Sequence, residues 1–214
     1  ALRVGSPTSA IWGVRWAGVD PATGRELFSL NGQLYDGATY NRLFNETSRE
    51  IIGNSQPDFF GGVFNTFTYR GLSLSVRATY RYGEDFLIQD ELENQYRVLT
   101  NRNLSVNVLD RWQQPGDIAP NPAVTATNPI LSNSSKYLYD GSHVKIQNIS
   151  LNYSIPLKNL TKGFFIESLS MFVDVSNVGY FYKEKSKTDL NGAAEYRFLY
   201  PEARTITLGV NASF

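Results

Sequence analysis

The sequence predicts an all-β chain that forms an antiparallel segment of a transmembrane β-barrel with long extracellular loops. Three observations predict this class. Apolar and polar residues alternate along stretches of about ten residues, short and long connections alternate between these stretches, and aromatic residues gather near their ends. Tyr, Phe and Thr, which favour strands, are abundant in the chain.

Composition excludes several other classes. The 214 residues carry 20 Lys and Arg against 20 Asp and Glu, so the formal net charge is zero and no nucleic-acid partner is expected. The absence of cysteine rules out a disulfide framework and a thiolate metal site. No stretch reaches the roughly 18 uncharged apolar residues of a membrane-spanning helix, whereas a barrel strand crosses with about 9 to 11 alternating residues. The sequence therefore excludes a helical membrane protein but not a membrane barrel.

Period-two alternation is clearest after Gly71, where the apolar face from Leu72 to Tyr82 opposes a face of Ser, Thr and Arg. Val144 and Ile146 break the pattern, because they fall on the otherwise polar face of their strand. Six strands are predicted, of which the first is the weakest: Thr8–Gly18, Gly62–Tyr69, Leu72–Tyr82, Gln147–Ile155, Leu169–Ser176 and Arg204–Phe214.

The connections differ in length as they do in bacterial barrels, which have short periplasmic turns and long extracellular loops. The short ones are Arg70-Gly71 and roughly Leu157–Ser168, and a further hairpin is expected at Asn31-Gly32. The long ones are expected outside the cell: Val19–Gly61, Gly83–Ser142 and Lys183–Ala203. Six strands cannot close a transporter barrel, so further strands must come from upstream in the same polypeptide or from another chain.

Tyrosines near the predicted strand ends would form the aromatic girdles of a barrel, although strands favour Tyr in any setting. They are Tyr69, Tyr80, Tyr82, Tyr153, Tyr180 and Tyr182.

Several short motifs follow one another in a telling order: Gly18–Gly24, Ile52–Pro57 leading to Gly61-Gly62, Arg111–Asp117, Tyr139–Leu151 followed by Tyr153–Pro156, and Tyr200-Pro201 with Arg204 and Leu208-Gly209. Each motif alone is common in loops. Together, in this order and spacing, they make nearly the whole chain resemble the SusC/RagA family of TonB-dependent transporters from the Bacteroidetes group.

The resemblance implies a barrel of about 22 strands with an N-terminal plug. Residues 1–214 would be one C-terminal part of it that supplies the last six strands, and the plug and earlier strands would lie outside this chain. The sequence opens on Ala1 without an export signal, which also predicts a fragment. The implied activity is import of large nutrients, glycans or peptides, across the cell outer membrane. A SusD-like surface lipoprotein would cap the barrel, and TonB would act through the absent N-terminal part.

No pattern predicts an enzyme, a cofactor or a metal site. The lone His143 has no nucleophilic Ser motif or carboxylate at a telling spacing beside it, so a structural or lumen-facing role is expected. The acidic cluster Asp90, Glu91 and Glu93 matches no calcium-loop template and reads as a solvated loop face.

Four charged residues occupy the inferred lumen face of the strands: Arg77, Arg81, Lys145 and Asp174. They could line a solute path, pair with plug carboxylates or simply face water, which charged groups can do there but not towards lipid.

An aromatic patch in or beside the longest loop is a candidate ligand or partner contact: Trp112, Tyr137 and Tyr139. Such rings could stack on sugars or pack against a lipoprotein partner.

The aromatic Phe214 at the end of an amphipathic strand resembles the signal that the barrel-assembly machinery reads. A membrane barrel would also contact lipid and lipopolysaccharide. Two alternatives to transport stay open: a SusC-like barrel that only scaffolds other surface proteins, and a soluble sugar-binding β-sandwich whose apolar faces form a mutual core.

Overall fold

The computed structural model describes residues 3–43, 49–87, 109–123, 133–157, 166–183 and 202–214, which divide into two compact units. The described part of the first unit consists of residues 3–43, 49–56, 84–87, 109–123 and 133–140. That of the second consists of residues 57–83, 141–157, 166–183 and 202–214.

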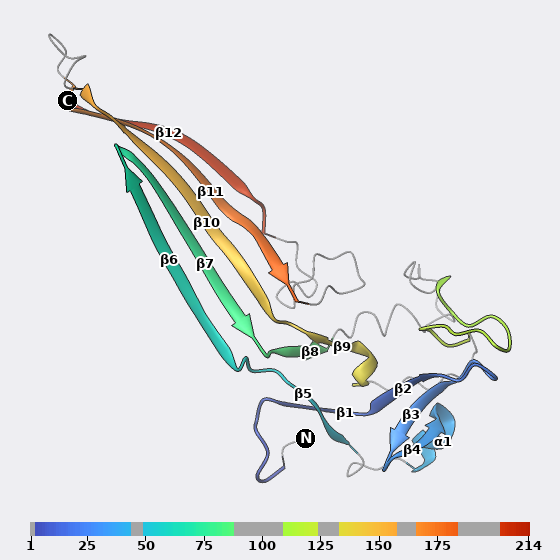
Figure 1. Cartoon of the computed structure of the whole chain (residues 1–214). Coiled ribbons are helices and arrows are strands. Elements are labelled where there is room, and N and C mark those ends of the chain that lie inside the picture. The colour runs from blue at the N-terminus through green and yellow to red at the C-terminus, as the bar shows by residue number, and fades with distance from the viewer. Residues whose placement is uncertain (1–2, 44–48, 88–108, 124–132, 158–165, 184–201) are drawn as a thin grey trace. The chain divides into compact units, whose positions relative to one another are not determined.

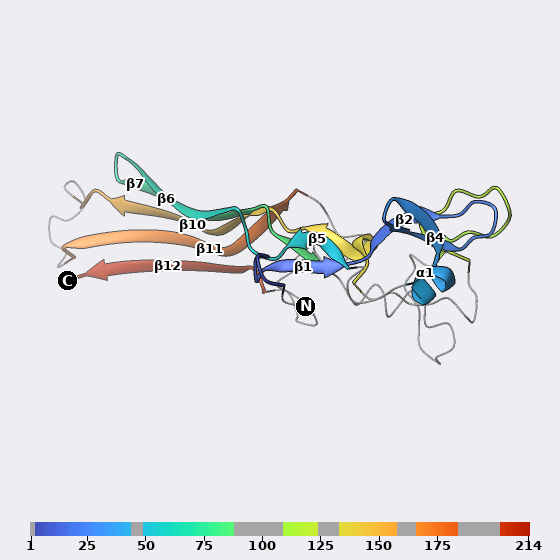
Figure 2. The same cartoon turned by 90° about the horizontal axis from the view of Figure 1, so that it is seen from below.

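The second unit is a five-stranded antiparallel sheet in the order β12-β11-β10-β7-β6, and its strands run side by side in Figures 1 and 2. The strands are β6 (Phe59–Tyr69), β7 (Leu72–Tyr82), β10 (His143–Ile155), β11 (Ser168–Tyr182) and β12 (Thr205–Ser213). Lengths of 9 to 15 residues are sufficient to cross a bilayer at a barrel's tilt. Five of the six expected strands are thus confirmed.

The sheet has one apolar face and one polar face. Directly paired residues of antiparallel strands share a face, and Ile149 pairs with Val76 and Val175, whereas its neighbour Ser150 pairs with Ser75 and Asp174. The apolar face has no packed core beneath it within the described residues. The side chains of Phe67 and Leu208, for example, remain 61% and 73% exposed. A soluble sandwich would bury them, so the two-faced sheet fits a barrel wall.

A bulge in β10 explains the two residues that break the sequence pattern. The register shifts between Ile146 and Asn148, which pair with the consecutive residues Ala78 and Arg77, so Gln147 is an extra residue. The bulge moves Val144 and Ile146 onto the apolar face and puts His143 and Lys145 on the polar face. The strand consequently extends as a continuous two-faced element to His143.

Both expected two-residue hairpins are present. Arg70 and Gly71 have φ values of 46° and 83° between β6 and β7, and Asn31 and Gly32 have φ values of 52° and 81°. Positive φ at both central positions is the requirement of a type I′ turn, whose twist matches that of the flanking strands.

The first unit is built from short elements: β1 (Ala10–Gly13), β2 (Arg15–Val19), β3 (Glu26–Leu30), β4 (Gln33–Asp36), α1 (Gly37–Leu43), β5 (Glu50–Asn54), β8 (Asp85–Leu87), the 3-10 helix η3 (Ser135–Tyr137) and β9 (Leu138–Asp140). Strand β1 pairs with β5, β2-β3-β4 form a three-stranded sheet, and β8 pairs with β9. The small core is formed by Val14, Phe28 and Tyr40, which are 3%, 1% and 1% exposed.

The prediction of a long strand at Thr8–Gly18 is wrong. This segment forms β1 and β2, whose ladders are interrupted by register shifts at Ile11/Trp12 and Trp16/Gly18. Its alternation has a local cause, because Val14 is buried in the small core and Trp16 packs against that core. Burial in a small core and exposure to lipid produce the same period of two.

Two of the expected long connections have structure of their own. Val19–Gly61 includes β3, β4, α1, β5 and the first residues of β6, and Gly83–Ser142 includes β8, η3 and β9. Most of Lys183–Ala203, most of Leu157–Ser168 and the acidic cluster Asp90, Glu91 and Glu93 lie outside the described residues. Where the structure is described, no helix combines the length and apolar character that a bilayer crossing demands.

Gly13 sits where the backbone of another segment comes very close. A Cβ atom at Gly13 would lie 2.1 Å from the backbone oxygen of Asn133 and 2.4 Å from Ile52 Cδ1. We expect Gly13→Ala to destabilise the β1-β5 region by about 1–3 kcal/mol, the usual cost of overpacking. Proteolysis of the folded full-length protein should then cut this region faster.

The matched control is Gly62→Ala, because a Cβ there meets nothing closer than 3.5 Å. Equal protease sensitivity of the two variants would contradict the close approach at Gly13.

Candidate functional site

The polar face of the long sheet brings together the charged residues that the sequence places there. Arg77 and Arg81 extend from β7, Lys145 from β10 and Asp174 from β11, and the register puts all four on one face. Their shared face is established by pairing, and their position towards a lumen stays a prediction.

Asp174 is held by neutral donors. The Asn148 side-chain amide donates to Asp174 Oδ1 and Oδ2 at 2.9 and 2.8 Å, and the Ser176 hydroxyl donates to Oδ1 at 3.1 Å. No ion pair to Asp174 is found among the residues that the structure describes. Its negative charge is therefore stabilised by hydrogen bonds and stays available to a solute or a partner surface.

Two of the three cations of this face, Arg77 and Lys145, contact aromatic rings. The Arg77 guanidinium lies 5.5 Å from the ring centroid of Phe64, and Lys145 Nζ lies 4.8 Å from that of Tyr180. Lys145 Nζ is also 3.4 Å from Glu202 Oε2. Cations over rings form a surface that combines charge with flat apolar area.

An aromatic cluster around His143 was missed by sequence reasoning. The rings of Tyr180 and Tyr182 stack at 5.4 Å with an interplanar angle of 6°, and His143 lies 5.7 and 5.6 Å from them. His143 Nδ1 is 2.8 Å from the Gly141 carbonyl oxygen. The signal was hidden because His143 lies beyond the β10 bulge, where simple alternation assigns it to the wrong face, whereas Tyr180 and Tyr182 are in phase with Asp174 on the polar face of β11.

The polar face thus has two chemically different halves. Towards the Arg70-Gly71 turn it consists mainly of hydroxyl and amide groups, such as the Thr66–Ser75 and Thr68–Ser73 pairs at 2.9 and 3.1 Å. Beyond the bulge it carries the rings and Lys145. Such a wall can hydrogen-bond a polar solute along its length and stack on it at one end.

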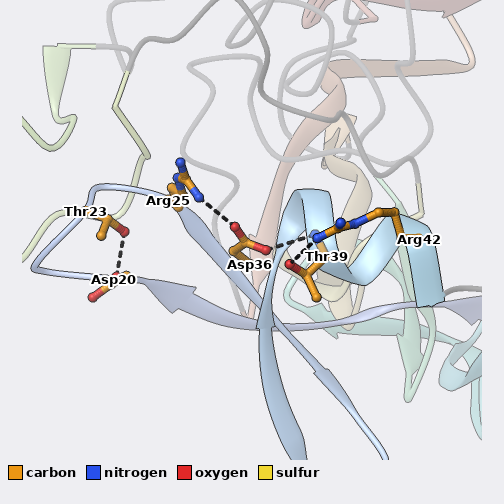
Figure 3. Close-up of polar contacts among 6 residues, drawn as sticks. All are labelled: Asp20, Thr23, Arg25, Asp36, Thr39 and Arg42. Atoms are coloured by element: carbon orange, nitrogen blue, oxygen red, sulfur yellow. Dashed lines mark hydrogen bonds and ion pairs between the residues drawn. The ribbon is translucent and has the colours of Figure 1, made fainter.

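In the first unit, Asp20 organises the turn of the motif Gly18–Gly24 (Figure 3). Its carboxylate accepts hydrogen bonds from the Thr23 hydroxyl and the Ala22 amide, which lower the pKa of Asp20. The Gly24 amide donates to the Asp20 carbonyl oxygen at 2.8 Å, and Gly24 has a φ of 66°.

Trp112 joins this turn to another of the motifs, Arg111–Asp117. Its Nε1 donates to the Pro21 carbonyl oxygen at 2.9 Å, and its ring lies over Gly24, where an added Cβ would be 2.4 Å from the ring. The Ala123 amide donates to the Gly24 carbonyl oxygen at 2.8 Å. Two motifs distant in sequence therefore form one joint, and the expected contact of Trp112 with a ligand or partner stays a prediction.

Asp36 caps helix α1. Its Oδ1 accepts the Thr39 amide at 2.9 Å, and its Oδ2 accepts Arg25 Nη1 at 2.8 Å, as Figure 3 shows. The side chain and amide of Thr39 are the main cause of a lowered pKa of Asp36, and Arg25 adds to it. In the helix itself, burial raises the pKa of Tyr40, with a smaller contribution from the charge of Glu50.

The two tyrosines of the expected aromatic patch are packing residues in this structure. Tyr137 and Tyr139 are 4% and 7% exposed, and Tyr139 stacks on Phe86 at 6.3 Å. No ring contact joins them to Trp112 among the described contacts. Their predicted ligand contact remains untested, and their burial argues against a direct one.

A nearly buried ion pair fixes η3 to β3. Lys136 Nζ is 3.2 Å from Glu26 Oε1, the two side chains are 9% and 11% exposed, and the ammonium group lies 5.2 Å from the Trp16 ring centroid. In the described ranges, no group of three or more His, Asp or Glu could hold a metal ion. Phe214 is 80% exposed after β12, and its role as an assembly signal stays a prediction.

Trp112→Ala should release the Arg111–Asp117 segment from the Asp20 turn, because it removes both the ring over Gly24 and the Nε1 hydrogen bond. The cost should fall below the about 3–5 kcal/mol of a fully buried Trp→Ala change. Trypsin should cut after Arg111 faster than in the parent protein. Trp112→Phe should have an intermediate effect, and an unchanged rate for Trp112→Ala would contradict the joint.

Acid should loosen the start of α1. The folded-state pKa of Asp36 lies below its usual value of 3.8, so its stabilising contribution is complete above that value and is lost as the pH falls through the folded-state pKa. Hydrogen exchange of the α1 peptide should rise below pH of about 4 relative to a reference peptide. Asp36→Asn keeps the cap without a titrating group and should lack this rise.

Comparison with known proteins shows relatives in sequence and in fold. No family model matches the chain. The TonB-dependent receptor P39 of Formosa agariphila is 28% identical over 224 residues, which is 87% of this chain and 21% of the relative. The receptor P3 of the same organism is 25% identical over 234 residues, which is 100% of this chain and 23% of the relative.

Among solved structures, the RagAB peptide transporter matches with a TM-score of 0.77 and 19% identity over 96% of this chain and 22% of that one. The RagAB peptide importer in the closed-closed state matches with a TM-score of 0.76. The chain thus spans about a fifth of the length of these proteins, which are named as receptors and transporters and not as enzymes. These findings confirm the resemblance carried by the motifs: the chain is similar in sequence to part of TonB-dependent receptors, and its fold matches part of the RagAB peptide transporter.

Proposed function

We propose that this chain forms part of the wall of an outer-membrane barrel that imports large nutrients, glycans or peptides, by TonB-dependent transport. The two-faced five-stranded sheet carries the proposal. Its apolar face, exposed in this chain, fits the lipid, and its polar face, with four charged residues, fits a water-filled lumen. Charged groups on the lipid side would cost about 2–4 kcal/mol each near the bilayer midplane.

The polar face supplies the contacts that a large solute needs. Asp174 and Arg77 offer opposite charges on neighbouring parts of the wall, and neither is in an ion pair within the described residues. Beyond the bulge, the stacked rings of Tyr180 and Tyr182 offer apolar area. This wall can guide a sugar chain or a peptide by weak contacts without any bond chemistry.

The orientation in the membrane follows from the connections. The tight Arg70-Gly71 turn belongs on the periplasmic side, and the long connections before β6 and between β7 and β10 belong outside. The motif joint at Trp112 would then give an external connection a fixed shape.

The partners are proposed on the same basis. A SusD-like lipoprotein would cap the barrel, as the family resemblance of the motifs implies and the fold match to the RagAB peptide transporter supports. TonB would act through the part of the receptor outside this chain. The barrel-assembly machinery would read Phe214, and phospholipid and lipopolysaccharide would contact the apolar face. A barrel that only scaffolds other surface proteins is the competing function, and transport assays separate the two.

Membrane placement can be tested with two neighbouring residues on opposite faces. Ile149→Arg puts a charge in the middle of the apolar face, and we expect a cost of about 2–4 kcal/mol with a matching loss of folded receptor in the outer membrane. Ser150→Arg is the control, because the added cation would face Asp174 on the polar side. Heat-modifiable migration of the full-length receptor measures the folded amount, and equal losses would contradict the assignment of faces.

Transport itself is tested by deleting the gene of the full-length receptor and measuring growth and uptake on a panel of soluble glycans and peptides. Loss of growth on one substrate, restored by the intact gene, is the expected result. Normal uptake of every substrate together with loss of other surface proteins would instead support the scaffold.

A further inference from the structure

We propose that Arg70 and Tyr69, at the turn between β6 and β7, form a binding site for the phosphate of a phospholipid headgroup. The inference rests on the proposed function, because it requires the apolar face of the sheet to lie in lipid. It adds a specific ligand contact at the rim of that face.

The backbone of Arg70 is the first observation. Its φ of 46° lies in the left-handed region, which Gly and Asn adopt readily and a long side chain does not. A type I′ turn favours Asn-Gly at these two positions, and the chain has Asn31-Gly32 in its other hairpin. Arginine at the strained position therefore brings no benefit to the turn and points to a role for its side chain.

The surroundings of the guanidinium are the second observation. It lies 5.2 Å from the ring centroid of Tyr69, which is 68% exposed and pairs with Leu72 on the apolar face. No carboxylate forms an ion pair with Arg70 among the residues whose structure is described. The guanidinium fork thus stands at the edge of the apolar face with its charge available, and this planar fork matches the oxygens of a phosphate group.

The position along the membrane normal is the third observation. The 11 residues of β7 span about 36 Å at about 3.3 Å per residue, and a tilt of about 45° reduces this to about 25 Å, the height of a barrel's apolar band. At the opposite end of the apolar face of β6 and β7, Lys183 Nζ lies 5.3 Å from the ring centroid of Tyr82. A cation on an apolar-face tyrosine thus marks each end of the band, at the level of the lipid headgroups.

The sheet contains its own matched control. Arg77 also lies over an aromatic ring of β6, with its guanidinium 5.5 Å from the Phe64 ring centroid, but on the polar face. Arg70 and Arg77 thus make the same intramolecular contact on the same strand pair. Only Arg70 should contact phospholipid.

The test compares variants of the full-length receptor extracted in detergent and titrated with phosphatidylglycerol under native mass spectrometry. Diacylglycerol, which has the same chains without the phosphate, is the reference ligand. Arg70→Gln should lower phosphatidylglycerol affinity by about fivefold, the change expected for one interfacial cation, and leave diacylglycerol binding unchanged. Arg77→Gln should leave both unchanged.

Arg70→Asn separates ligand binding from turn stability. Because Asn fits the left-handed position, this variant should keep or raise the thermal stability of the receptor while losing phospholipid affinity as Arg70→Gln does. Unchanged phosphatidylglycerol affinity in both Arg70 variants, or an equal loss in Arg77→Gln, would overturn the site. Failure of the parent receptor to insert into liposomes would instead overturn the membrane placement on which the inference rests.

Discussion

The backbone hydrogen bonds of the long sheet are the constraint on which its other features depend. Lipid offers no partner for an exposed N–H or C=O group, so a strand can cross only when neighbours satisfy it on both sides. Strands β7, β10 and β11 have two neighbours each, and the outer edges of β6 and β12 need strands from elsewhere in the barrel. Once the backbone is fixed in this way, period-two alternation decides which side chains meet lipid and which meet water.

Alternation made most of this sheet predictable from sequence. Strand β7 and the Asn148–Ile155 part of β10 carry uninterrupted apolar faces, and the turn at Arg70-Gly71 has the glycine that its geometry favours. The bulge at Gln147 was not predictable, because an extra residue leaves no mark beyond the apparent misplacement of Val144 and Ile146. As a result, His143 could not be assigned to the face of Tyr180 and Tyr182 before the register was known.

In the first unit, the same alternation led to a wrong prediction. Its alternation at Trp12, Val14 and Trp16 serves a small buried core, and local sequence cannot distinguish that cause from lipid exposure. The order of the motifs predicted the family resemblance, but not that Trp112 would lie on Gly24 or donate to Pro21, 91 residues away. Contacts of this range depend on the path of the whole chain between them. For the same reason the burial of Tyr137 and Tyr139 could not be predicted from the composition of the connection that contains them.

Because of the bulge at Gln147, the alternation of side chains between the two faces changes phase within β10. Below it, Asn148–Ile155 must keep one phase, since a slip of one residue would turn every apolar group inward. Above it, the extra residue returns Val144 and Ile146 to the apolar face, so removing one residue there would turn these two side chains inward and bring His143 and Lys145 to the apolar face, without changing the phase of Asn148–Ile155. One inserted residue therefore keeps the apolar face continuous along the whole strand and at the same time brings His143 and Lys145 beside Tyr182 and Tyr180 on the polar face.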